Sequence, residues 1–267
     1  MLKMCYIQAM STDNPAVSDF RHQRILRLAT TQPEVRIRDL AQKLGVSDMT
    51  IRRDLKELTD QGLLERTHGG ARLKAQGNTE LALGHRLQRQ THAKEQIART
   101  ALSLIQDGDT IALDASTTTL YLAHLLAGRN VHCLVTGLDA ANTLSQLQVP
   151  FTLIGGTFHP AARSFISGLF NDIQGRLHPD KVFFSCMGYT SHAGFTDAHL
   201  PEVSSKATLL STGKQVIALL DHTKFGQQAV ATITRMHSVH TLITDAPPPE
   251  GVTRDITLHH TELIITP

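Results

Sequence analysis

Cysteine is scarce in this sequence, and its spacing excludes two kinds of site. Cys5, Cys133 and Cys186 are odd in number, lie far apart and form no C-x-x-C pair. A disulfide framework or a thiolate zinc site needs paired or closely spaced cysteines, so reduced and buried thiols are expected. The fifteen histidines show neither an H-E-x-x-H motif nor the spacing of a zinc finger, so no metal ion is expected either.

Long apolar runs and an export signal are also absent. No stretch approaches the roughly 18 consecutive apolar residues that a membrane span needs, and the first ten residues are too short and broken for a signal peptide. A cytoplasmic protein without a membrane attachment is therefore expected, with residues 1–18 as a disordered lead-in. The 267 residues exceed a typical domain of roughly 100 to 200 residues, which favours two domains.

A strong overall charge is lacking too, because the formal net charge is only +2. The charge is nevertheless uneven along the chain. Residues 1–74 contain 13 Lys and Arg against 9 Asp and Glu, a balance of +4, whereas the remainder contains 13 against 15, a balance of −2. A basic N-terminal part on a mildly acidic body indicates attachment to a phosphate backbone through that part.

Apolar periodicity predicts three helices and a hairpin in the N-terminal domain, residues 19–74. The expected elements are helices over 19–30, 37–44 and from Ser47 to Gly62, then strands over 63–67 and 71–73 on either side of a turn at 68–70. Pro33 and Gly45 end the first two helices, and the Ser47 hydroxyl suits the cap of the third. This order of elements is that of a winged helix-turn-helix.

The third helix carries the residues that are expected to contact DNA. Ile51, Leu55 and Leu58 recur at the spacing of one buried helix face. That spacing leaves four polar side chains free to face outward, where they are expected to meet DNA, namely Thr50, Arg52, Arg53 and Lys56. Because an arginine pairs with two acceptors of guanine, at least one of the two arginines is expected to read a base. The alternative is a solvated face on which the arginines pair with Asp48 and Asp54.

Two longer motifs connect this helix to a known family. The segments VS-x-x-TIRRDL (46–55) and G-x-L-x-R-x-HGGA (62–71) resemble the DNA-binding domain of the deoxyribose-operon repressor (DeoR) family of bacterial regulators. The resemblance implies a double-stranded DNA operator as partner, contacted from the helix by Ser47, Thr50, Arg52 and Arg53 and from the wing by Arg66 and His68. Gly69 belongs to the same surface, because a tight turn at the duplex needs a positive φ and close backbone approach.

A polar linker at 75–92 is expected to lead to a second domain, residues 93–267. There, short apolar strands alternate with helices, which predicts an α/β domain with a parallel sheet. The expected strands are 110–114, 131–136, 151–156, 181–188, 215–221 and 241–245, and the expected helices are 93–105, 119–126, 138–147, 168–177 and 202–211. The segment 188–196 is expected to be a glycine-rich loop.

Polar residues at the strand ends predict a site for a phosphorylated effector, because ligands of parallel sheets bind beyond the carboxyl ends of the strands. Asp114 ends one strand, and Ser116, Thr117 and Thr118 open the next helix, where hydroxyl and free N–H groups bind anions. The alternative is that these residues only cap the helix. Other strand ends and the helix between the last two are expected to add Thr136, Gly155, Gly156, Gly188, Lys206, Asp221 and Lys224.

The second domain also resembles its counterpart in the DeoR family. The segments K-x-x-IA-x-x-A (94–101), DG-x-x-I-x-LD-x-x-TT (107–118), LIGG (153–156) and D-x-TKFG (221–226) match the sensor half of those repressors. The resemblance implies a fold similar to the sugar-phosphate isomerases and a response to phosphorylated intermediates of sugar catabolism. The sequence departs from the family pattern at Ser116, where glycine is usual, and at Gly137, where asparagine is usual.

These features together predict a homo-oligomeric repressor of a carbohydrate-catabolic operon, which a phosphorylated sugar releases from DNA. The alternative is a sugar-phosphate isomerase-like enzyme fused to a DNA-binding head, with Glu202 and Asp114 as candidate bases. Because resemblance of fold does not carry activity, neither a catalytic residue nor a cofactor is expected. A purely structural DNA-binding protein would leave the polar strand ends without a purpose.

Overall fold

A computed structural model describes residues 21–22, 24–25, 28–29, 34–60, 64–73, 86–87, 89–160, 162–166 and 175–267. The chain divides into two compact units, Met1–His85 and Arg86–Pro267. The predicted lead-in at 1–18 and most of the predicted linker at 75–92 lie outside the described residues. Within the described ranges, no helix is long and apolar enough to cross a membrane.

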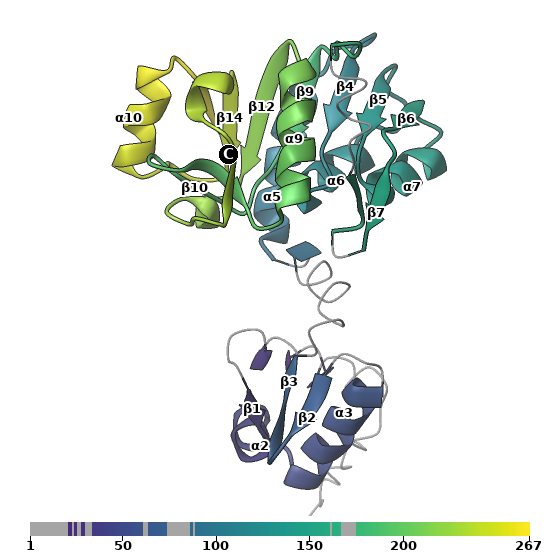
Figure 1. Cartoon of the computed structure of the whole chain (residues 1–267), viewed down its shortest axis with the longest axis vertical. Helices are drawn as coiled ribbons and strands as arrows, with labels where there is room; N and C mark the ends of the chain where they lie inside the picture. The colour runs from purple at the N-terminus through teal and green to yellow at the C-terminus, as the bar shows by residue number, and fades with distance from the viewer. Residues whose placement is uncertain are drawn as a thin grey trace, which may run out of the picture. The chain divides into compact units, whose positions relative to one another are not determined.

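The first unit is a winged helix-turn-helix, as predicted (Figure 1). Its elements are β1 (Val35–Arg36), α2 (Ile37–Leu44), α3 (Asp48–Asp60), β2 (Leu64–Thr67) and β3 (Gly70–Leu73), with the strands in the order β1-β3-β2. Helix α2 ends at Gly45, whose φ of 68° is a left-handed conformation that glycine adopts without strain. Ile51, Leu55 and Leu58 of α3 are buried in one core with Leu40 of α2, as their spacing predicted.

The described residues of the first predicted helix are helical, namely Arg21, His22, Arg24, Ile25, Leu28 and Ala29. The predicted helix end at Gly62 lies outside the described residues. Gly70 was expected in the turn, but it begins β3 and pairs with both Arg36 and Thr67.

The second unit is built on a seven-stranded sheet in the order β15-β14-β12-β9-β4-β5-β6, and its strand pairs are parallel. The strands are β4 (Thr110–Leu113), β5 (His132–Val135), β6 (Phe151–Leu153), β9 (Lys181–Phe184), β12 (Gln215–Leu220), β14 (Thr241–Thr244) and β15 (Glu262–Ile265). From β4 the chain moves outward to β5 and β6, then returns to β9 and continues in the opposite direction. Such a reversal, here between β4 and β9, is where doubly wound sheets bind ligands, beyond the carboxyl ends of their strands.

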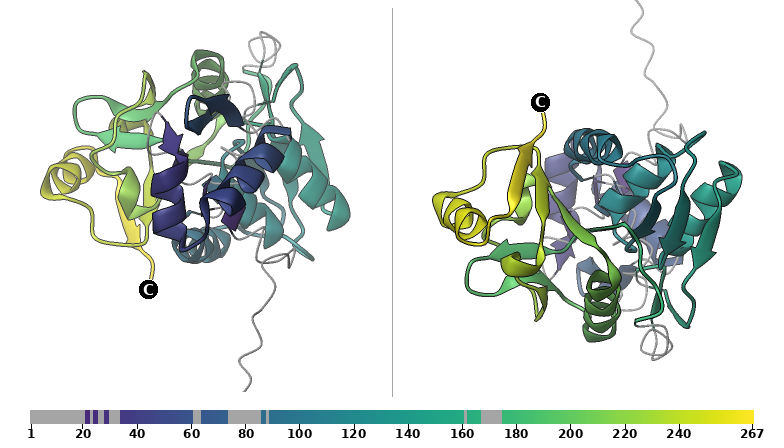
Figure 2. Two further views of the ribbon diagram at one scale, coloured as in Figure 1. Left: turned by 90° about the horizontal axis from the view of Figure 1, so that it is seen from below. Right: turned by 90° about the horizontal axis from the view of Figure 1, so that it is seen from above.

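Helices cover both faces of this sheet (Figures 1 and 2). One face carries α5 (Thr91–Ser103), α6 (Thr117–His124) and α7 (Leu138–Gln146), and the other carries α9 (Leu200–Thr212) and α10 (Glu250–Leu258). Alternate residues of β4 enter the two cores: Ile111 and Leu113 pack in the core of α5 to α7, and Ala112 packs in that of α9. The sheet is therefore the middle of three layers, which leaves its strand ends as the accessible positions for a ligand.

The unit also contains antiparallel strands that were not predicted. These are the hairpin β7 (Thr157–His159) with β8 (Ser164–Ile166), and a small sheet of β10 (Gly188–Thr190), β11 (Gly194–Asp197) and β13 (Ala231–Thr234). The prediction of a loop at 188–196 is therefore wrong. Gly194 has a φ of 73°, and a Cβ there would lie 2.5 Å from the Thr234 carbonyl oxygen, so glycine serves the close approach of two strands rather than an open loop.

The second unit differs from the predicted elements at two further places. Most of the helix predicted at 168–177 lies outside the described residues, and residues 175–177 are not helical. Helix α10 and strand β15, at the C-terminal edge of the sheet, were not predicted.

Candidate functional site

Helix α3 presents a basic outer face. Arg52, Arg53 and Lys56 are exposed, whereas Ile51 and Leu55 on the opposite face are fully buried. Of the other predicted DNA contacts on the helix, Ser47 is exposed and Thr50 is half-buried. The predicted set therefore lies on the surface of one helix, accessible to a partner.

The start of α3 is fixed by the two hydroxyl residues of the predicted set. The Thr50 amide donates to Ser47 Oγ at 3.1 Å, and the two side-chain oxygens lie 2.9 Å apart. This is the capping arrangement that the sequence predicted, and such a cap stabilises a helix by about 1 kcal/mol. Ser47 and Thr50 thus fix the first turn of α3, and Arg52 and Arg53 come directly after that turn.

Asp54, one of the two acidic residues predicted as alternative partners of Arg52 and Arg53, belongs instead to a buried ion pair. Asp54 is 2% exposed, and its oxygens accept from Arg21 Nε at 2.6 Å and Arg21 Nη2 at 2.8 Å. Its Oδ1 also lies 3.2 Å from His22 Nε2. Asp54 therefore ties the first helical segment to the inner face of α3 instead of pairing with the outer face. Arg53 pairs instead with half-buried Glu57, at 3.3 Å.

The wing is the turn between β2 and β3, and its two glycines serve different purposes. Gly69 has a φ of 100° with open space around it, as a tight turn requires. Gly70 is fixed by contact, because an added Cβ would lie 2.0 Å from the Val35 carbonyl oxygen. Arg66, His68 and Gly69, the predicted wing contacts, are all exposed.

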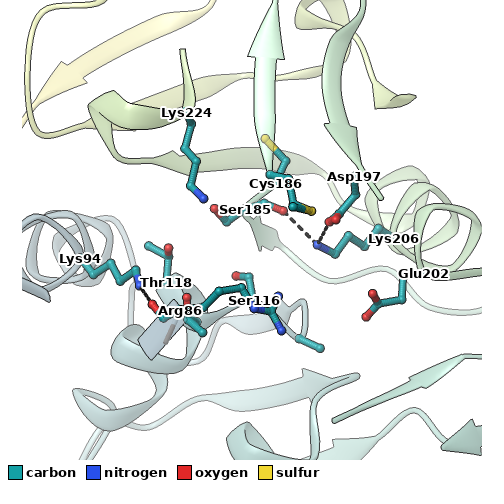
Figure 3. A pocket seen from close by; sticks show the side chains of 13 residues that line it. Arg86, Lys94, Ser116, Thr118, Ser185, Cys186, Asp197, Glu202, Lys206 and Lys224 are labelled. Carbon is teal, nitrogen blue, oxygen red and sulfur yellow. Dashed lines mark hydrogen bonds and ion pairs between the residues drawn. The ribbon is translucent and has the colours of Figure 1, made fainter. Parts of the chain in front are cut away.

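In the second unit, a pocket lies at the reversal point of the sheet, between the ends of β4 and β9 (Figure 3). Its lining consists of Arg86, Lys94, Ala115, Ser116, Thr117, Thr118, Ser185, Cys186, Met187, Asp197, Glu202, Lys206 and Lys224. Five of these residues were predicted to bind the effector, namely Ser116, Thr117, Thr118, Lys206 and Lys224. The topology therefore brings together predicted residues that are up to 108 positions apart in the sequence, from Ser116 to Lys224.

Asp114 lies beneath the pocket and joins its parts. Its carboxylate is 1% exposed and accepts from the Ser116 amide at 3.1 Å, the Ser185 amide at 3.2 Å and Thr119 Oγ1 at 2.9 Å. It also lies 3.1 Å from Lys206 Nζ. With its oxygens engaged in this way, Asp114 connects the ends of β4 and β9 to α9 and is poorly placed to act as a general base.

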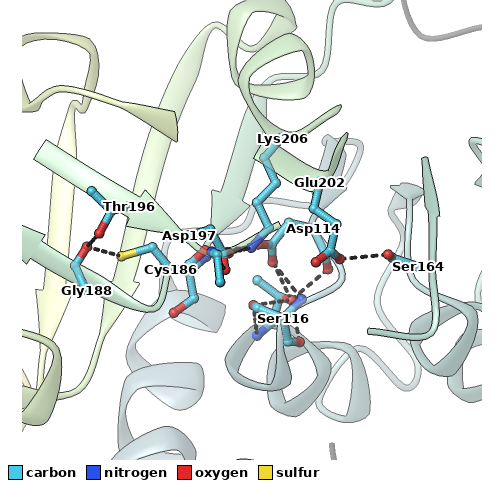
Figure 4. Close-up of polar contacts among 12 residues, drawn as sticks. Asp114, Ser116, Ser164, Cys186, Gly188, Thr196, Asp197, Glu202 and Lys206 are labelled. Atoms are coloured by element: carbon cyan, nitrogen blue, oxygen red, sulfur yellow. Dashed lines mark hydrogen bonds and ion pairs between the residues drawn. The ribbon is translucent and has the colours of Figure 1, made fainter. Parts of the chain in front are cut away.

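Lys206 is an internal cation held by two carboxylates (Figure 4). Its Nζ lies 2.8 Å from Asp197 Oδ2 and donates to the Ser185 carbonyl oxygen at 3.1 Å. Burial opposes the charge of Lys206, but Asp114 and Asp197 raise its pKa above the usual range. In return, although burial opposes ionisation of Asp197, Lys206 holds the pKa of that carboxyl below its usual range.

The N-terminus of α6 forms one wall of the pocket. Ser116 is its N-cap residue, and its Oγ accepts from the Thr119 amide at 3.3 Å. The cap interpretation of Ser116 is therefore correct. It is compatible with anion binding, because the amides of Thr117 and Thr118 belong to the first turn, where N–H groups have no partner within a helix.

Three further cations surround this helix start. Lys94 comes from α5, Arg86 lies shortly before α5, and Lys224 lies beyond β12. Lys94 is buried and donates to the Arg86 carbonyl oxygen. Burial, followed by the positive charges of Lys224 and Arg86, lowers the pKa of Lys94 to about 8 against the opposing effect of Asp221. The pocket therefore concentrates positive charge beside α6.

Besides Asp114, which lies beneath the pocket, five predicted effector residues do not line it: Thr136, Gly155, Gly156, Gly188 and Asp221. The Thr136 carbonyl accepts from the Phe165 amide, Gly155 and Gly156 lie between β6 and β7, and Gly188 begins β10. Asp221 is buried and accepts from the Thr223 amide at 3.1 Å, which fixes the turn that carries Lys224.

Several lining residues were not predicted. Lys94 opens the segment K-x-x-IA-x-x-A (94–101), and this motif was the signal that could have identified it. Asp197 ends β11, a strand that was expected to be a loop. Three other lining residues follow β9 directly, namely Ser185, Cys186 and Met187. They were missed because the strand was predicted to extend over 181–188, which placed them inside it rather than beyond its carboxyl end, where ligands bind.

A winged helix-turn-helix with an exposed basic helix, joined in one chain to an α/β unit with a polar pocket at its switch point, defines a DNA-binding transcriptional regulator. The comparisons with known proteins agree. The model of the DeoR-like helix-turn-helix domain matches residues 21–76, and that of the DeoR C terminal sensor domain matches residues 89–246. The chain belongs to the DeoR family of transcriptional regulators.

Its relatives extend over nearly the whole chain. The glycerol-3-phosphate regulon repressor of Escherichia coli (strain K12) is 32% identical over 246 residues, which cover 91% of this chain and 97% of the relative. The lactose phosphotransferase system repressor of Streptococcus mutans is 31% identical over 229 residues, 84% of this chain and 91% of the relative. Among solved structures, ribose 5-phosphate isomerase A of Methanocaldococcus jannaschii is 14% identical with a TM-score of 0.38, over 49% of this chain and 53% of that one.

Proposed function

We propose that this regulator represses a carbohydrate-catabolic operon as a homo-oligomer, and that a phosphorylated sugar bound in the pocket releases it from its operator. The observation that carries the effector part of this proposal is the group of three cations, Arg86, Lys94 and Lys224, beside the N-terminus of α6. The DNA part rests on the exposed basic face of α3 and on the family.

The three cations favour a phosphate group over a neutral ligand. The charges of Lys224 and Arg86 help to lower the pKa of Lys94 to about 8, so both repel the Lys94 ammonium group. A phosphate dianion placed between them relieves this repulsion and accepts from the amides at the start of α6. Lys206 contributes little to this charge, because Asp114 and Asp197 already neutralise it.

The other wall of the pocket suits the hydroxyl groups of a sugar. Asp197 and Glu202 line it, and carboxylate oxygens accept hydrogen bonds from hydroxyl donors. Glu202 uses Oε1 to accept from Ser164 Oγ at 2.7 Å. Cations on one side and carboxylates on the other orient a ligand that has a phosphate at one end and hydroxyls at the other.

The names of the relatives support both parts of the proposal. The Escherichia coli and Streptococcus mutans proteins are named as repressors of carbohydrate systems, and the first name contains a phosphorylated polyol. Neither name describes an enzyme. A sugar-phosphate isomerase activity has less support, because the buried Asp114 is engaged by three donors and Lys206.

Two pocket residues suggest how the effector acts on the DNA-binding unit. Arg86 and Lys94 lie at the very start of the second unit, so they follow the segment that leads from the first. A phosphate that draws these side chains toward α6 therefore acts on the residues that begin the second unit. In a homo-oligomer, this movement shifts the population toward a form whose DNA-binding units no longer match the operator half-sites.

The test is isothermal titration of the full chain against a panel of glycerol 3-phosphate, hexose and pentose phosphates and their unphosphorylated counterparts. A phosphorylated member should bind, its unphosphorylated counterpart should bind far more weakly, and the same compound should release a duplex selected from a random library. Lys94→Ala and Lys224→Ala should each weaken binding by about 10- to 100-fold, the range for a charged hydrogen bond. The control is Lys214→Ala, which removes an exposed lysine outside the pocket.

Three results would contradict the proposal. Binding by no phosphorylated compound would remove the effector, and binding with unchanged operator affinity would remove its regulatory role. Turnover of a bound sugar phosphate would establish the isomerase-like alternative.

A further inference from the structure

A cluster of two histidines and a glutamate lies at the edge of the pocket, on different elements from the cations. His159 ends β7, His199 immediately precedes α9, and Glu202 lies in the first turn of α9. One ligand-type atom of each residue lies within 4.8 Å of those of the other two. We refer to these three residues as the His-His-Glu cluster.

The histidines of the cluster have unused nitrogen atoms. Nδ1 of His159 and Nδ1 of His199 are both buried, and neither has a hydrogen-bond partner among the described residues. The two rings are stacked, with centroids 3.8 Å apart and planes 7° apart. A buried polar atom without a partner is unfavourable, and each ring of this stacked pair carries one such atom. Their adjacency indicates a shared ligand.

The chemistry of the cluster favours a cation as that ligand. His159 and His199 each offer a ring nitrogen that has no hydrogen-bond partner among the described residues, and ring nitrogens of neutral histidine are common metal ligands. Glu202 adds negative charge, with Oε2 3.9 Å from His159 Nδ1. Its Oε1 accepts from Ser164 Oγ at 2.7 Å, which orients the carboxylate as outer hydrogen bonds orient metal ligands.

We propose that His159, His199 and Glu202 bind one divalent transition-metal ion, of which Zn²⁺ fits best. Two imidazoles and one carboxylate are a ligand set of zinc sites that keep a fourth position open. Imidazole nitrogen selects zinc over magnesium or calcium, which prefer oxygen ligands only. The absence of an H-E-x-x-H motif does not exclude this site, because its ligands come from a hairpin and a helix that lie 40 residues apart in the sequence.

The distances require a small closure, and at least one of the two stacked rings must also turn so that both in-plane nitrogen lone pairs point at one ion. Bonds of about 2.0 to 2.2 Å place the ligands of a tetrahedral zinc ion about 3.4 Å apart. The atoms of the cluster, within 4.8 Å of one another, therefore approach by about 1 Å or slightly more when an ion binds. His159 lies at the end of a short hairpin strand, and side-chain rotation there supplies this movement.

Because Glu202 also lines the pocket, an ion bound to this residue would lie at the edge of the pocket. The open fourth position of the ion is then available to water or to a hydroxyl oxygen of a ligand. This consequence rests on the proposed function, whereas binding of the metal itself does not.

The direct test is titration of the metal-free full chain with Zn²⁺ alone, in competition with a chromophoric chelator. One ion per chain should bind with submicromolar affinity. X-ray absorption of the loaded protein should show nitrogen and oxygen neighbours at about 2.0 to 2.1 Å and no sulfur at about 2.3 Å. Affinity only in the millimolar range, or a sulfur neighbour, overturns the proposal.

Substitutions locate the ion. Loss of an outer hydrogen-bond partner alone weakens metal binding by about 10- to 100-fold, so His199→Gln and Glu202→Gln should each cost more than about 100-fold. His178→Gln is the matched control, because His178 is exposed and lies outside the cluster. Circular dichroism checks that each variant folds. If His199→Gln does not fold, Glu202→Gln, which preserves the shape of the side chain, provides the test. Unchanged zinc affinity in a folded variant overturns the assignment.

Discussion

The Lys206 ammonium lies 2.8 Å from the carboxylate of Asp197, inside the pocket that is proposed to bind an anion. Both side chains are about one-tenth exposed, and Asp114, also buried, lies 3.1 Å from the same nitrogen. Lys206 therefore balances two negative charges that belong to the protein. Its position on α9 makes it the link between that helix and the ends of β4, β9 and β11.

Replacing Lys206 by methionine should destabilise the protein strongly. The variant leaves two carboxylates buried without a counter-charge, and breaking a buried pair in this way costs about 3 to 5 kcal/mol. Urea unfolding measures the change. Lys214→Met is the control, since Lys214 pairs with Asp180 at 2.7 Å while 67% exposed, and an exposed pair is worth about 1 kcal/mol or less. Equal effects of the two substitutions would show that Lys206 is not a structural cation.

Effector affinity should depend on pH through Lys94. In the free protein the pKa of Lys94 is about 8, so the side chain loses its charge as the pH rises past that value. A bound anion favours the charged form and raises this pKa, so the affinity is full below pH 8 and falls above it. The fall is at most about tenfold per pH unit until the pKa of the complex is reached.

Titration between pH 7 and 9 measures this dependence, because a phosphate ester, whose second pKa is about 6, keeps its charge over that interval. Lys94→Arg is the informative variant, since arginine stays charged throughout. It should bind with an affinity that is nearly constant over the interval. If the wild-type affinity is flat as well, Lys94 does not contact the anion.

The fold was predictable where local signals act alone. Helix α2 has both ends where the sequence placed them, because Gly45 stops it in a left-handed conformation. The hairpin of β10 and β11 was missed, because glycine is common both in loops and where two strands approach closely. Only the contact of Gly194 with Thr234, 40 residues away, distinguishes the two cases.

The sequence predicted those parts of the candidate site that lie just beyond the carboxyl ends of the parallel strands. Ser116, Thr117 and Thr118 follow β4 after only two intervening residues, so a parallel sheet places them at its strand-end edge, where the pocket lies. Lys94 and Asp197 come from a helix before the sheet and from an antiparallel strand. Their approach depends on tertiary packing, which residue spacing does not encode.

Gly70→Ala should disrupt the wing while leaving the second unit intact. The new Cβ would lie 2.0 Å from the Val35 carbonyl oxygen, so β1 and β3 must separate. We expect operator affinity to fall at least tenfold, about 1.4 kcal/mol, with effector affinity unchanged. Hydrogen exchange should show faster exchange at the Ile37 amide, which donates to Gly69 beside this contact. Normal protection there would mean that the sheet accommodates the methyl group.

Arg53 and Lys56, one turn apart on α3, should affect DNA binding in different ways. If Arg53 reads a guanine, Arg53→Ala costs about 1 to 3 kcal/mol on the operator and relaxes preference at one base pair. Lys56→Ala should weaken all sequences equally and lower the slope of log affinity against log salt by about 0.9, the value for one phosphate contact.

Both residues form exposed pairs within the helix, Arg53 with Glu57 at 3.3 Å and Lys56 with Asp60 at 2.6 Å, so their loss should change stability little and similarly. Fluorescence anisotropy at several salt concentrations, with operator and scrambled duplexes, separates the two effects. Arg52→Ala completes the set. If it alters base preference and Arg53→Ala does not, the reading arginine is Arg52, and Arg53 is a phosphate contact.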